Sequence, residues 1–217
     1  MPPVPPKPAP PSHDRARRLL DIVVAAVALA SAAPLMLLIA ALIRRDSPGP
    51  ALFRQTRAGR DGRPFTLLKF RTMRTDADPY GASPHAADDP RLTRFGRLLR
   101  ETSLDELPQL WNVLRGDMTL VGPRPLYESQ AAEWNERQRR RLTVRPGLTG
   151  LAQVCGRAAL TIEEKLELDV QYVLNRGPRL DAWILWRTLC QLFGRPAIYE
   201  VRYSHTEEIR GAGDSIR

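Results

Sequence analysis

Residues 19–43 read LLDIVVAAVALASAAPLMLLIAALI and form one long apolar run in which Asp21 is the only charged residue. A helix over this run, rising about 1.5 Å per residue, is long enough to cross a hydrocarbon layer about 30 Å thick. Because the run is apolar on every side, it is not typical of the core helix of a soluble domain. Its length and the lack of a small-residue cleavage site argue against a secretory signal peptide. The run therefore predicts a helix in a membrane.

Basic residues flank this apolar run on both sides: Arg15, Arg17, Arg18, Arg44 and Arg45. Since basic flanks favour the cytoplasmic side of a membrane, two basic ends are best satisfied when both remain on that side. Pro34 lies near the middle of the run, where a proline removes a backbone hydrogen bond and bends a helix. We therefore expect residues 15–45 to form a re-entrant helix that enters one leaflet, bends and returns. A straight span is the alternative.

The two ends of the chain differ in composition from the part between them. Seven of the first eleven residues are prolines, which favour an extended polyproline conformation and cannot build a core. We expect residues 1–14 to be a disordered tail and the polar residues 204–217 to be a flexible one. The chain of 217 residues is long enough for one sizeable domain, which we place at residues 46–203.

Short strands and helices are expected in this domain. The patterning predicts strands over Ala51–Gln55 and Phe65–Arg71, which would form a hairpin, and a polar loop over Thr75–Pro90. Helices are expected over residues 91–100, 104–115, 127–141 and 162–176. The fold class is then α+β and mostly helical, with an N-terminal re-entrant membrane helix, a small β-hairpin and several short amphipathic helices at the membrane interface.

A last helical stretch, Leu180–Phe193, reads LDAWILWRTLCQLF and is too short to span a membrane. It carries Trp183 and Trp186, and tryptophan favours the interface between membrane and water. Two interpretations stay open for this stretch, a helix of the core and a helix that lies in the membrane interface.

The charge of the chain indicates a polyanionic partner. Lys and Arg number 33 against 24 Asp and Glu, a formal net charge of +9. Such an excess fits nucleic acid, anionic lipid or a phosphorylated substrate. Cys155 and Cys190 lie far apart and outside any C-x-x-C pattern, so neither a disulfide framework nor a zinc site is expected.

An acidic pair, Asp105–Glu106, lies among arginines. One interpretation is local, because Ser103 and Glu106 fit the S-x-x-E capping box that opens a helix. The alternative is chemical: a carboxylate among arginines is kept ionised and can bind a divalent cation or attack phosphorus, while the arginines neutralise phosphate oxygens. The preceding arginines, spaced by three, would share one helix face: Arg94, Arg97 and Arg100.

Several motifs in a fixed order resemble those of one known family. They are Asp46-Ser47-Pro48-Gly49-Pro50, Phe53-Arg54-Gln55, Lys69-Phe70-Arg71-Thr72-Met73, Ser103-Leu104-Asp105-Glu106-Leu107-Pro108-Gln109-Leu110, Asn112-Val113-Leu114-Arg115-Gly116-Asp117-Met118, Val121-Gly122-Pro123-Arg124-Pro125, Arg145-Pro146-Gly147-Leu148-Thr149-Gly150 and Gly156-Arg157. The chain resembles, over about residues 15 to 200, the bacterial sugar transferases that are monotopic polyprenyl-phosphate phosphoglycosyltransferases. Its length is similar to that of the small members, which consist of the catalytic domain alone.

The resemblance implies a function. The enzyme would move a sugar 1-phosphate from a UDP-sugar to polyprenyl (undecaprenyl) phosphate and release UMP, with Mg²⁺ as cofactor. This is the first membrane step in making a surface glycan such as O-antigen, capsule, exopolysaccharide or a glycoprotein oligosaccharide. Residues 46–203 would be a catalytic domain on the cytoplasmic face of the bacterial inner membrane, and membrane lipids would be partners. Neither the sugar nor the glycan follows from the sequence.

The resemblance also implies roles for individual residues. Asp105 would be the nucleophile that forms a phosphosugar-aspartyl intermediate, and Glu106 would hold the metal with it or manage a proton. Six basic residues would bind phosphate or nucleotide groups: Arg100, Arg124, Arg157, Lys69, Arg71 and Arg145. For the last three, structural roles in strands and turns explain the residues nearly as well.

Two positions depart from the family pattern, and two other functions fit the sequence less well. Ala33-Pro34 stands where the family often has Ser-Pro, so the bend must rest on Pro34 and packing. Cys155 stands where a polar residue is common, which leaves the sugar preference open. A nucleic-acid-binding protein is disfavoured because aromatic residues make up only 6% of the chain, and a membrane adaptor leaves the Asp105–Glu106 cluster unexplained. A homodimer is compatible with the sequence, but no pattern of residues indicates one.

Overall fold

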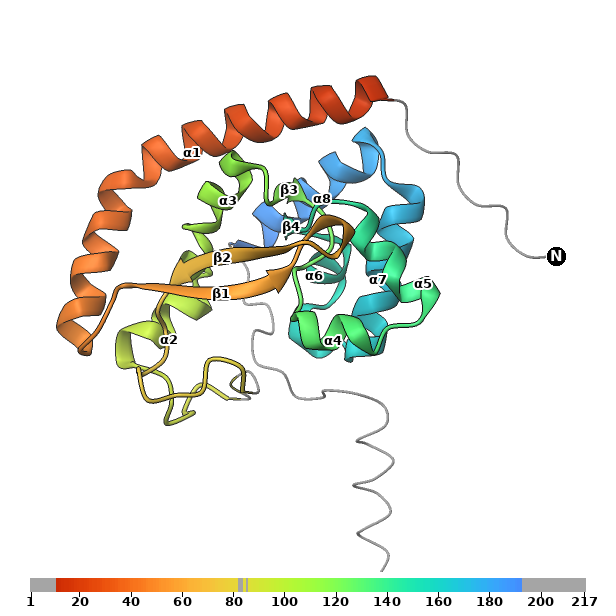
Figure 1. Ribbon diagram of the computed structural model, residues 1–217. Coiled ribbons are helices and arrows are strands. Elements are labelled where there is room, and N and C mark those ends of the chain that lie inside the picture. The colour runs from red at the N-terminus through yellow and green to blue at the C-terminus, as the bar shows by residue number, and fades with distance from the viewer. Residues whose placement is uncertain (1–10, 82–83, 85, 193–217) are drawn as a thin grey trace, which may run out of the picture.

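The computed structural model describes residues 11–81, 84 and 86–192 (Figure 1). The flexible tail expected at residues 204–217, and most of the proline-rich tail, lie outside the described residues. The α-helices are α1 Pro11–Asp46, α2 Arg94–Glu101, α3 Gln109–Arg115, α4 Glu128–Ala132, α5 Glu136–Arg139, α6 Leu151–Cys155, α7 Ile162–Asn175 and α8 Pro178–Leu192. The strands are β1 Leu52–Ala58, β2 Pro64–Phe70, β3 Thr119–Val121 and β4 Gly147–Thr149. Short 3-10 helices are η1 Arg60–Gly62, η2 Leu104–Glu106, η3 Arg140–Thr143 and η4 Arg157–Ala159.

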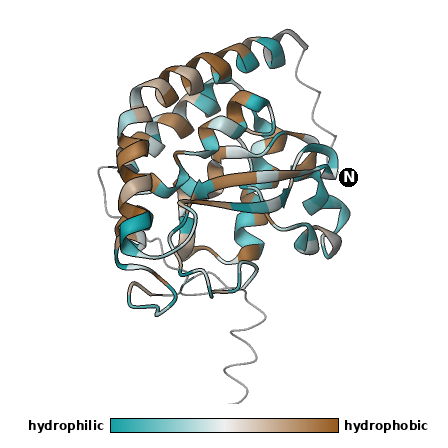
Figure 2. Cartoon of the chain, turned by 60° about the vertical axis from the view of Figure 1, so that its left-hand side comes forward, coloured by the Kyte–Doolittle hydropathy of each residue, from teal (hydrophilic) through white to brown (hydrophobic). Residues whose placement is uncertain are grey.

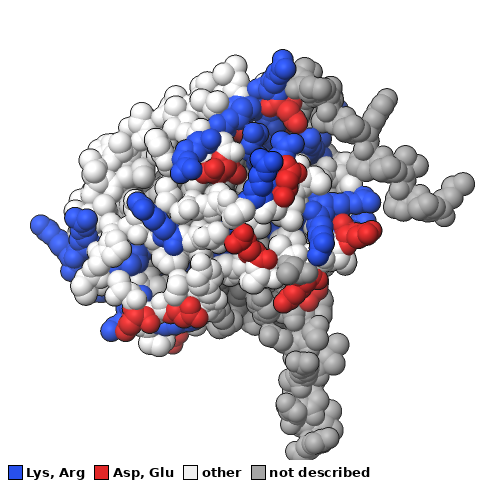
Figure 3. Space-filling model, viewed as in Figure 1, with Lys and Arg blue, Asp and Glu red and all other residues white. Residues whose placement is uncertain are grey.

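Helix α1 lies as an arc across the top and down the left of the body (Figure 1). It is continuous through Pro34, so the chain bends without a break in the helix. Its middle is mainly apolar, and the surface above it carries almost no charge (Figures 2 and 3). By length and composition, residues 14–46 could cross a membrane, and only 11% of the most apolar window is buried against the rest of the chain. The helix therefore presents its apolar surface outward.

The N-terminal half of α1 is tied to the body by hydrogen bonds. Arg17 donates to the carbonyl of Val121 and to the hydroxyl of Tyr172. The buried Asp21 accepts from Thr119 Oγ1 at 2.7 Å and from the amide of Leu120 at 3.0 Å. The one acid in the apolar run is therefore an anchor, since both of its oxygens satisfy donors of β3.

The C-terminal half of α1 is held mainly by apolar packing. Ile39 and Ile43 are buried with Phe70 of β2 and Leu99 of α2, which excludes water from both helices. Together with the anchor at Asp21, this contact places both ends of α1 on the same body.

The predicted hairpin is confirmed. Strands β1 and β2 pair antiparallel, from Leu52 opposite Phe70 to Ala58 opposite Pro64. The buried side chain of Asn112 in α3 joins this hairpin to the helices, because its amide donates to the carbonyl of Thr66 and its oxygen accepts from the amide of Leu68.

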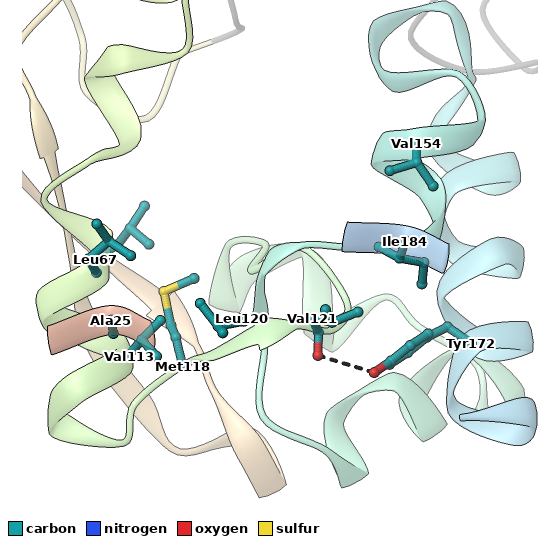
Figure 4. Close-up of a cluster of buried hydrophobic side chains, with 10 residues drawn as sticks. Ala25, Leu67, Val113, Met118, Leu120, Val121, Val154, Tyr172 and Ile184 are labelled. Carbon is teal, nitrogen blue, oxygen red and sulfur yellow. Dashed lines mark hydrogen bonds between the residues drawn. The ribbon is translucent and has the colours of Figure 1, made fainter. Parts of the chain in front are cut away.

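A second, parallel ladder was not predicted. Strands β3 and β4 pair through Thr119 opposite Gly147 and Val121 opposite Thr149. The backbones approach so closely that a Cβ on Gly147 would lie 2.1 Å from the amide nitrogen of Gly122, a position only glycine can occupy. Side chains around this ladder form the main core, where the hydroxyl of Tyr172 reaches the carbonyl of Val121 (Figure 4).

The helices predicted over residues 104–115 and 127–141 are revised in detail, the first because it is divided into η2 and α3. The helix expected over residues 127–141 is divided into α4, α5 and η3, because Asn135 caps a new helix by accepting from the amide of Gln138. In α8, Ile184 is fully buried while Trp183 and Trp186 are exposed. The helix therefore belongs to the core on one face and offers tryptophans on the other.

Candidate active site

One large cavity of 1710 Å³ lies between the hairpin, α1 and the loops around β3. This volume exceeds the roughly 300–1,000 Å³ of an ordinary small-ligand pocket. Most of its charged lining residues are basic, and its acidic lining includes Asp105, Glu106 and Asp169. The space suits more than one anionic molecule.

The acidic pair lies in η2, directly after α2. Ser103 turns the chain into η2 with a left-handed φ of 58° and makes no side-chain cap, so the capping-box prediction is wrong. Leu104 and Leu107 on either side pack against buried clusters of the core. This packing holds the turn so that Asp105 is 8% exposed at the cavity wall.

Four cations come from four separate segments to surround the pair. Lys69 lies on β2, Arg100 on α2, Arg124 in the loop after β3, and Arg157 in η4; all four line the cavity. Arg124 donates to Glu106 at 2.8 Å. The structure thus brings both predicted catalytic acids together with four of the six predicted substrate-binding residues, and a fifth, Arg71, lines the same cavity.

The surroundings of the two acids shift their pKa values in opposite directions. Burial and the nearby Glu106 raise the pKa of Asp105 to about 6, against the opposing effect of Lys69 and Arg100. Burial also acts to raise the pKa of Glu106, but the ion pair with Arg124 and the charge of Lys69 bring it below its ordinary value. Burial lowers the pKa of Lys69 to about 8. Near neutral pH both acids and the lysine are therefore mainly charged.

The backbone is strained on both sides of the site. Among the described residues, Asp61, Ser103 and Arg157 are the non-glycine residues with positive φ. Arg157 has φ 51°, a conformation unfavourable for a residue with a side chain. Such strain is commonly kept at functional sites, and here it aims Arg157 into the cavity.

Arg71 and Arg145 are placed differently from the other predicted ligands. Arg71 lines the cavity but is buried, and its guanidinium donates to the carbonyls of Ser47 and Pro50 and to the hydroxyl of Ser47 in the linker after α1. Arg145 donates to the carbonyl of Gly116 and is not among the described residues that line the cavity. The geometry gives both arginines structural partners.

Residues that the sequence analysis missed also line the cavity. Arg57 lies 3.7 Å above the ring of Tyr127, and Tyr80 approaches the same ring at 5.8 Å. On another wall, the buried Arg141 pairs with Asp169 at 2.5 Å. Nothing in the local sequence brings either group together, because each is assembled from segments distant in the chain.

The acids can accommodate Mg²⁺ if a phosphate supplies further oxygens. Within the described part of the chain, no group of three or more His, Cys, Asp or Glu residues could hold a metal. Two carboxylates plus substrate phosphates is, however, a common way for proteins to bind Mg²⁺. Asp105 and Glu106 fit this pattern.

Cys155, the position at which the sequence departs from the family pattern, is exposed and does not line the cavity.

One edge of the cavity is apolar and belongs to α1. Leu37, Ala40 and Ala41 line it, with Arg44 one turn further along. These residues continue the exposed apolar surface of the helix. The cavity therefore joins an apolar surface to a cationic floor, which suits an amphipathic molecule with an anionic head.

Comparison with known proteins gives a consistent result. A family model described as bacterial sugar transferase matches residues 12–195. The chain is 43% identical over 198 residues to a protein of Bacillus subtilis named uncharacterized sugar transferase EpsL, with 91% of this chain and 97% of that protein covered.

Relatives with more specific names are longer. The chain is 48% identical over 183 residues to a Caulobacter vibrioides UDP-glucose:undecaprenyl-phosphate glucose-1-phosphate transferase, covering 81% of this chain and 66% of that protein. It is 38% identical over 179 residues to an Aeromonas hydrophila UDP-N-acetylgalactosamine-undecaprenyl-phosphate N-acetylgalactosaminephosphotransferase, covering 80% and 42%. The chain thus spans two thirds or less of these two relatives.

Proposed function

The chain belongs to the bacterial sugar transferase family, and from that premise we propose that it transfers a sugar 1-phosphate from a UDP-sugar to polyprenyl phosphate and releases UMP. The observation that carries the proposal is the buried Asp105, which faces a cavity floored by Lys69, Arg100, Arg124 and Arg157 and edged by the apolar surface of α1. Such a cavity suits a nucleoside diphosphate and a lipid phosphate in turn. The names of the relatives point to the same pair of substrates.

The reaction proceeds in two steps at one phosphorus atom. An oxygen of Asp105 attacks the phosphorus bonded to the sugar, the bond to the UMP oxygen breaks, and UMP leaves with the electron pair. An oxygen of polyprenyl phosphate then attacks the same phosphorus, and the bond to Asp105 breaks, which restores the carboxylate. Covalent catalysis of this kind lets a soluble and a lipid substrate use one nucleophile in succession.

The surrounding residues make this attack electrostatically feasible. A carboxylate and a diphosphate repel each other, so the cations at the cavity floor offset the charge that develops in the transition state. Mg²⁺ bound by Asp105, Glu106 and the diphosphate would add further neutralisation. Glu106 keeps Arg124 beside the attacking acid through their ion pair at 2.8 Å.

The membrane arrangement follows from α1. Both of its ends contact the same body, while the apolar residues between them are largely exposed. A re-entrant helix that dips into one leaflet satisfies both observations, whereas a straight span would carry one end away from the body. The catalytic domain would then lie on the cytoplasmic face of the inner membrane, where the lipid phosphate enters along Leu37 and Ala40.

A UMP-release assay tests the reaction. The protein in detergent, with Mg²⁺, polyprenyl phosphate and a panel of UDP-sugars, is expected to release UMP continuously with at least one donor. Without polyprenyl phosphate, release should stop near one UMP per protein, and the protein mass should rise by one sugar phosphate. Asp105→Asn should abolish both signals, while Asp88→Asn, an exposed aspartate outside the cavity lining, should retain them.

Separate outcomes contradict separate parts of the proposal. No UMP from any donor would overturn the reaction, and full turnover by Asp105→Asn would overturn the nucleophile alone.

Topology is tested by tags at the two termini in cells. Both should report the cytoplasm, and opposite sides would mean that the helix spans the membrane.

A further inference from the structure

One buried ion pair on the cavity wall has no part in the reaction as described above. Asp169 of α7 is 2% exposed and Arg141 of η3 is 3% exposed. The Nε and Nη2 atoms of Arg141 donate to the same oxygen of Asp169, Oδ2, at 3.1 and 2.5 Å. Both residues line the cavity.

This buried ion pair is not expected to stabilise the fold. The other carboxylate oxygen of Asp169, Oδ1, is buried without a hydrogen-bond partner among the described residues, and burying an unpaired polar atom costs free energy. Buried ion pairs can often be replaced by apolar residues without loss of stability. Its position in the cavity wall therefore calls for another explanation.

The pair is linked directly to the acidic dyad. The same Nη2 atom of Arg141 donates to the carbonyl oxygen of Arg124 at 2.5 Å, and the guanidinium of Arg124 donates to Glu106 at 2.8 Å. Hydrogen bonds thus link Asp169 to Arg141 and Arg141 to the backbone of Arg124, and the side chain of Arg124 carries the link on to Glu106.

Arg141 is fixed in place on more than one side. Its guanidinium lies 4.7 Å from the ring centre of the buried Trp134, and Asp169 holds its edge. The loop that it contacts is itself stiff, because Arg124 stands between the buried prolines Pro123 and Pro125. The side chain of Arg124, in contrast, is half exposed, so the fixed backbone can serve as a pivot for a guanidinium that meets the substrate.

We propose that Asp169 and Arg141 are positioning residues that set the backbone of Arg124, and through it the guanidinium that acts on the transferred phosphate. The inference rests on the proposed function and adds two residues that touch neither phosphate nor the reacting carboxylate. It predicts that loss of the pair lowers catalysis through Arg124 and through no other residue.

A double-mutant cycle on kcat/KM for UMP release tests this coupling. Asp169→Asn is expected to lower kcat/KM about 10- to 50-fold in the wild-type background, because a 1 Å misplacement can cost up to about 100-fold. In an Arg124→Lys background the same substitution should cost less than about 3-fold, since its route of action is already impaired. Equal losses in both backgrounds would overturn the proposal, because a general structural defect does not depend on Arg124.

A matched control is available on the same helix. Glu167 of α7 pairs with Arg137 at 2.7 Å, but this pair is exposed and lies outside the cavity lining. Glu167→Gln should change kcat/KM less than about 2-fold. Wild-type turnover is measured first, so that an inactive wild type, which contradicts the proposed reaction, is not confused with an uncoupled pair.

A second variant covers the case in which Asp169→Asn does not fold. The double substitution Arg141→Met with Asp169→Leu removes both charges and keeps similar volume, so it should fold as well as wild type. It is expected to lose the same 10- to 50-fold in kcat/KM while its thermal unfolding temperature is maintained. A folded double variant with full activity would overturn the proposal.

Discussion

Two buried aspartates, Asp21 and Asp105, occupy opposite kinds of surroundings. Asp21, on α1, is 4% exposed and accepts hydrogen bonds from the hydroxyl of Thr119 and the amide of Leu120. Asp105, in η2, is 8% exposed, and burial raises its pKa to about 6 among four cations that line a cavity. The first carboxylate serves donors of the fold, and the second is held ready for a ligand. Burial of an acid therefore says little about its role by itself; its partners distinguish the anchor Asp21 from Asp105, the nucleophile that we propose.

The largest expected contrast is in catalysis. Asp105→Asn should lower the rate of UMP release by at least about 10³-fold, as is usual when a nucleophile is removed. Its unfolding temperature should be unchanged or higher, because a partly desolvated charge is removed. Rate and thermal unfolding are measured on the same detergent-solubilised preparation. A marked fall in stability would place Asp105 with Asp21 as a structural residue.

The opposite pattern is expected at Asp21. Asp21→Ala leaves two buried donors of β3 unpaired and should lower the free energy of unfolding by about 2–4 kcal/mol, at about 1–2 kcal/mol for each donor. The folded fraction should keep nearly full specific activity. Chemical denaturation monitored by tryptophan fluorescence gives the stability, with Asp88→Ala as an exposed control. If stability is unchanged, the anchor described for α1 does not operate.

A smaller effect should come from the cations that only Asp105 has. Arg124→Lys keeps the charge but loses the planar fork that can bind two oxygens, and kcat/KM should fall about 10- to 100-fold. Arg137→Lys is the matched control, because Arg137 forms a similar ion pair with Glu167 at 2.7 Å and neither residue lines the cavity. This control should change kcat/KM less than about 2-fold. Similar losses in both variants would mean that the fork of Arg124 has no special role.

The smallest effect near neutral pH is expected in the pH dependence of the rate. Attack requires ionised Asp105, whose pKa is about 6, and charged Lys69, whose pKa is about 8. For the UDP-sugar, kcat/KM should therefore rise tenfold per pH unit below about 6 and fall at the same rate above about 8. Lys69→Arg should move the alkaline limb upward, since arginine stays charged. An alkaline limb that does not move would remove Lys69 from this assignment.

The chemistry of the site could be predicted from the sequence because its two central residues are neighbours in the chain. Asp105 and Glu106 stand next to each other, and the order of the surrounding motifs identifies the family. The same motifs could not distinguish arginines that face phosphate from arginines that bind carbonyl groups. Arg71 belongs to a family motif, yet its guanidinium donates to Ser47 and Pro50, a result that depends on tertiary structure.

The fold was accessible where a pattern is long and local. The apolar run predicts α1, and alternation predicts the hairpin β1–β2. The parallel ladder could not be predicted because β3 and β4 have three residues each, too few to show a hydrophobic period. The Arg141–Asp169 pair could not be predicted because its members lie 28 residues apart in the sequence, and no local sequence pattern indicates a contact at that separation.

The anchors of α1 have a consequence for the order in which the protein is made. Asp21 bonds to residues 98 and 99 positions later in the chain, and Arg17 to residues 104 and 155 positions later. At a synthesis rate of about 5–20 residues per second, these partners leave the ribosome roughly 5–30 s after the residues of α1 that they bind. For most of that interval the helix, which ends at Asp46, is complete while its hydrogen-bond partners do not yet exist. Its docking onto β3 is therefore a late event, and a chain that stalls before residue 119 leaves the helix without its polar anchor.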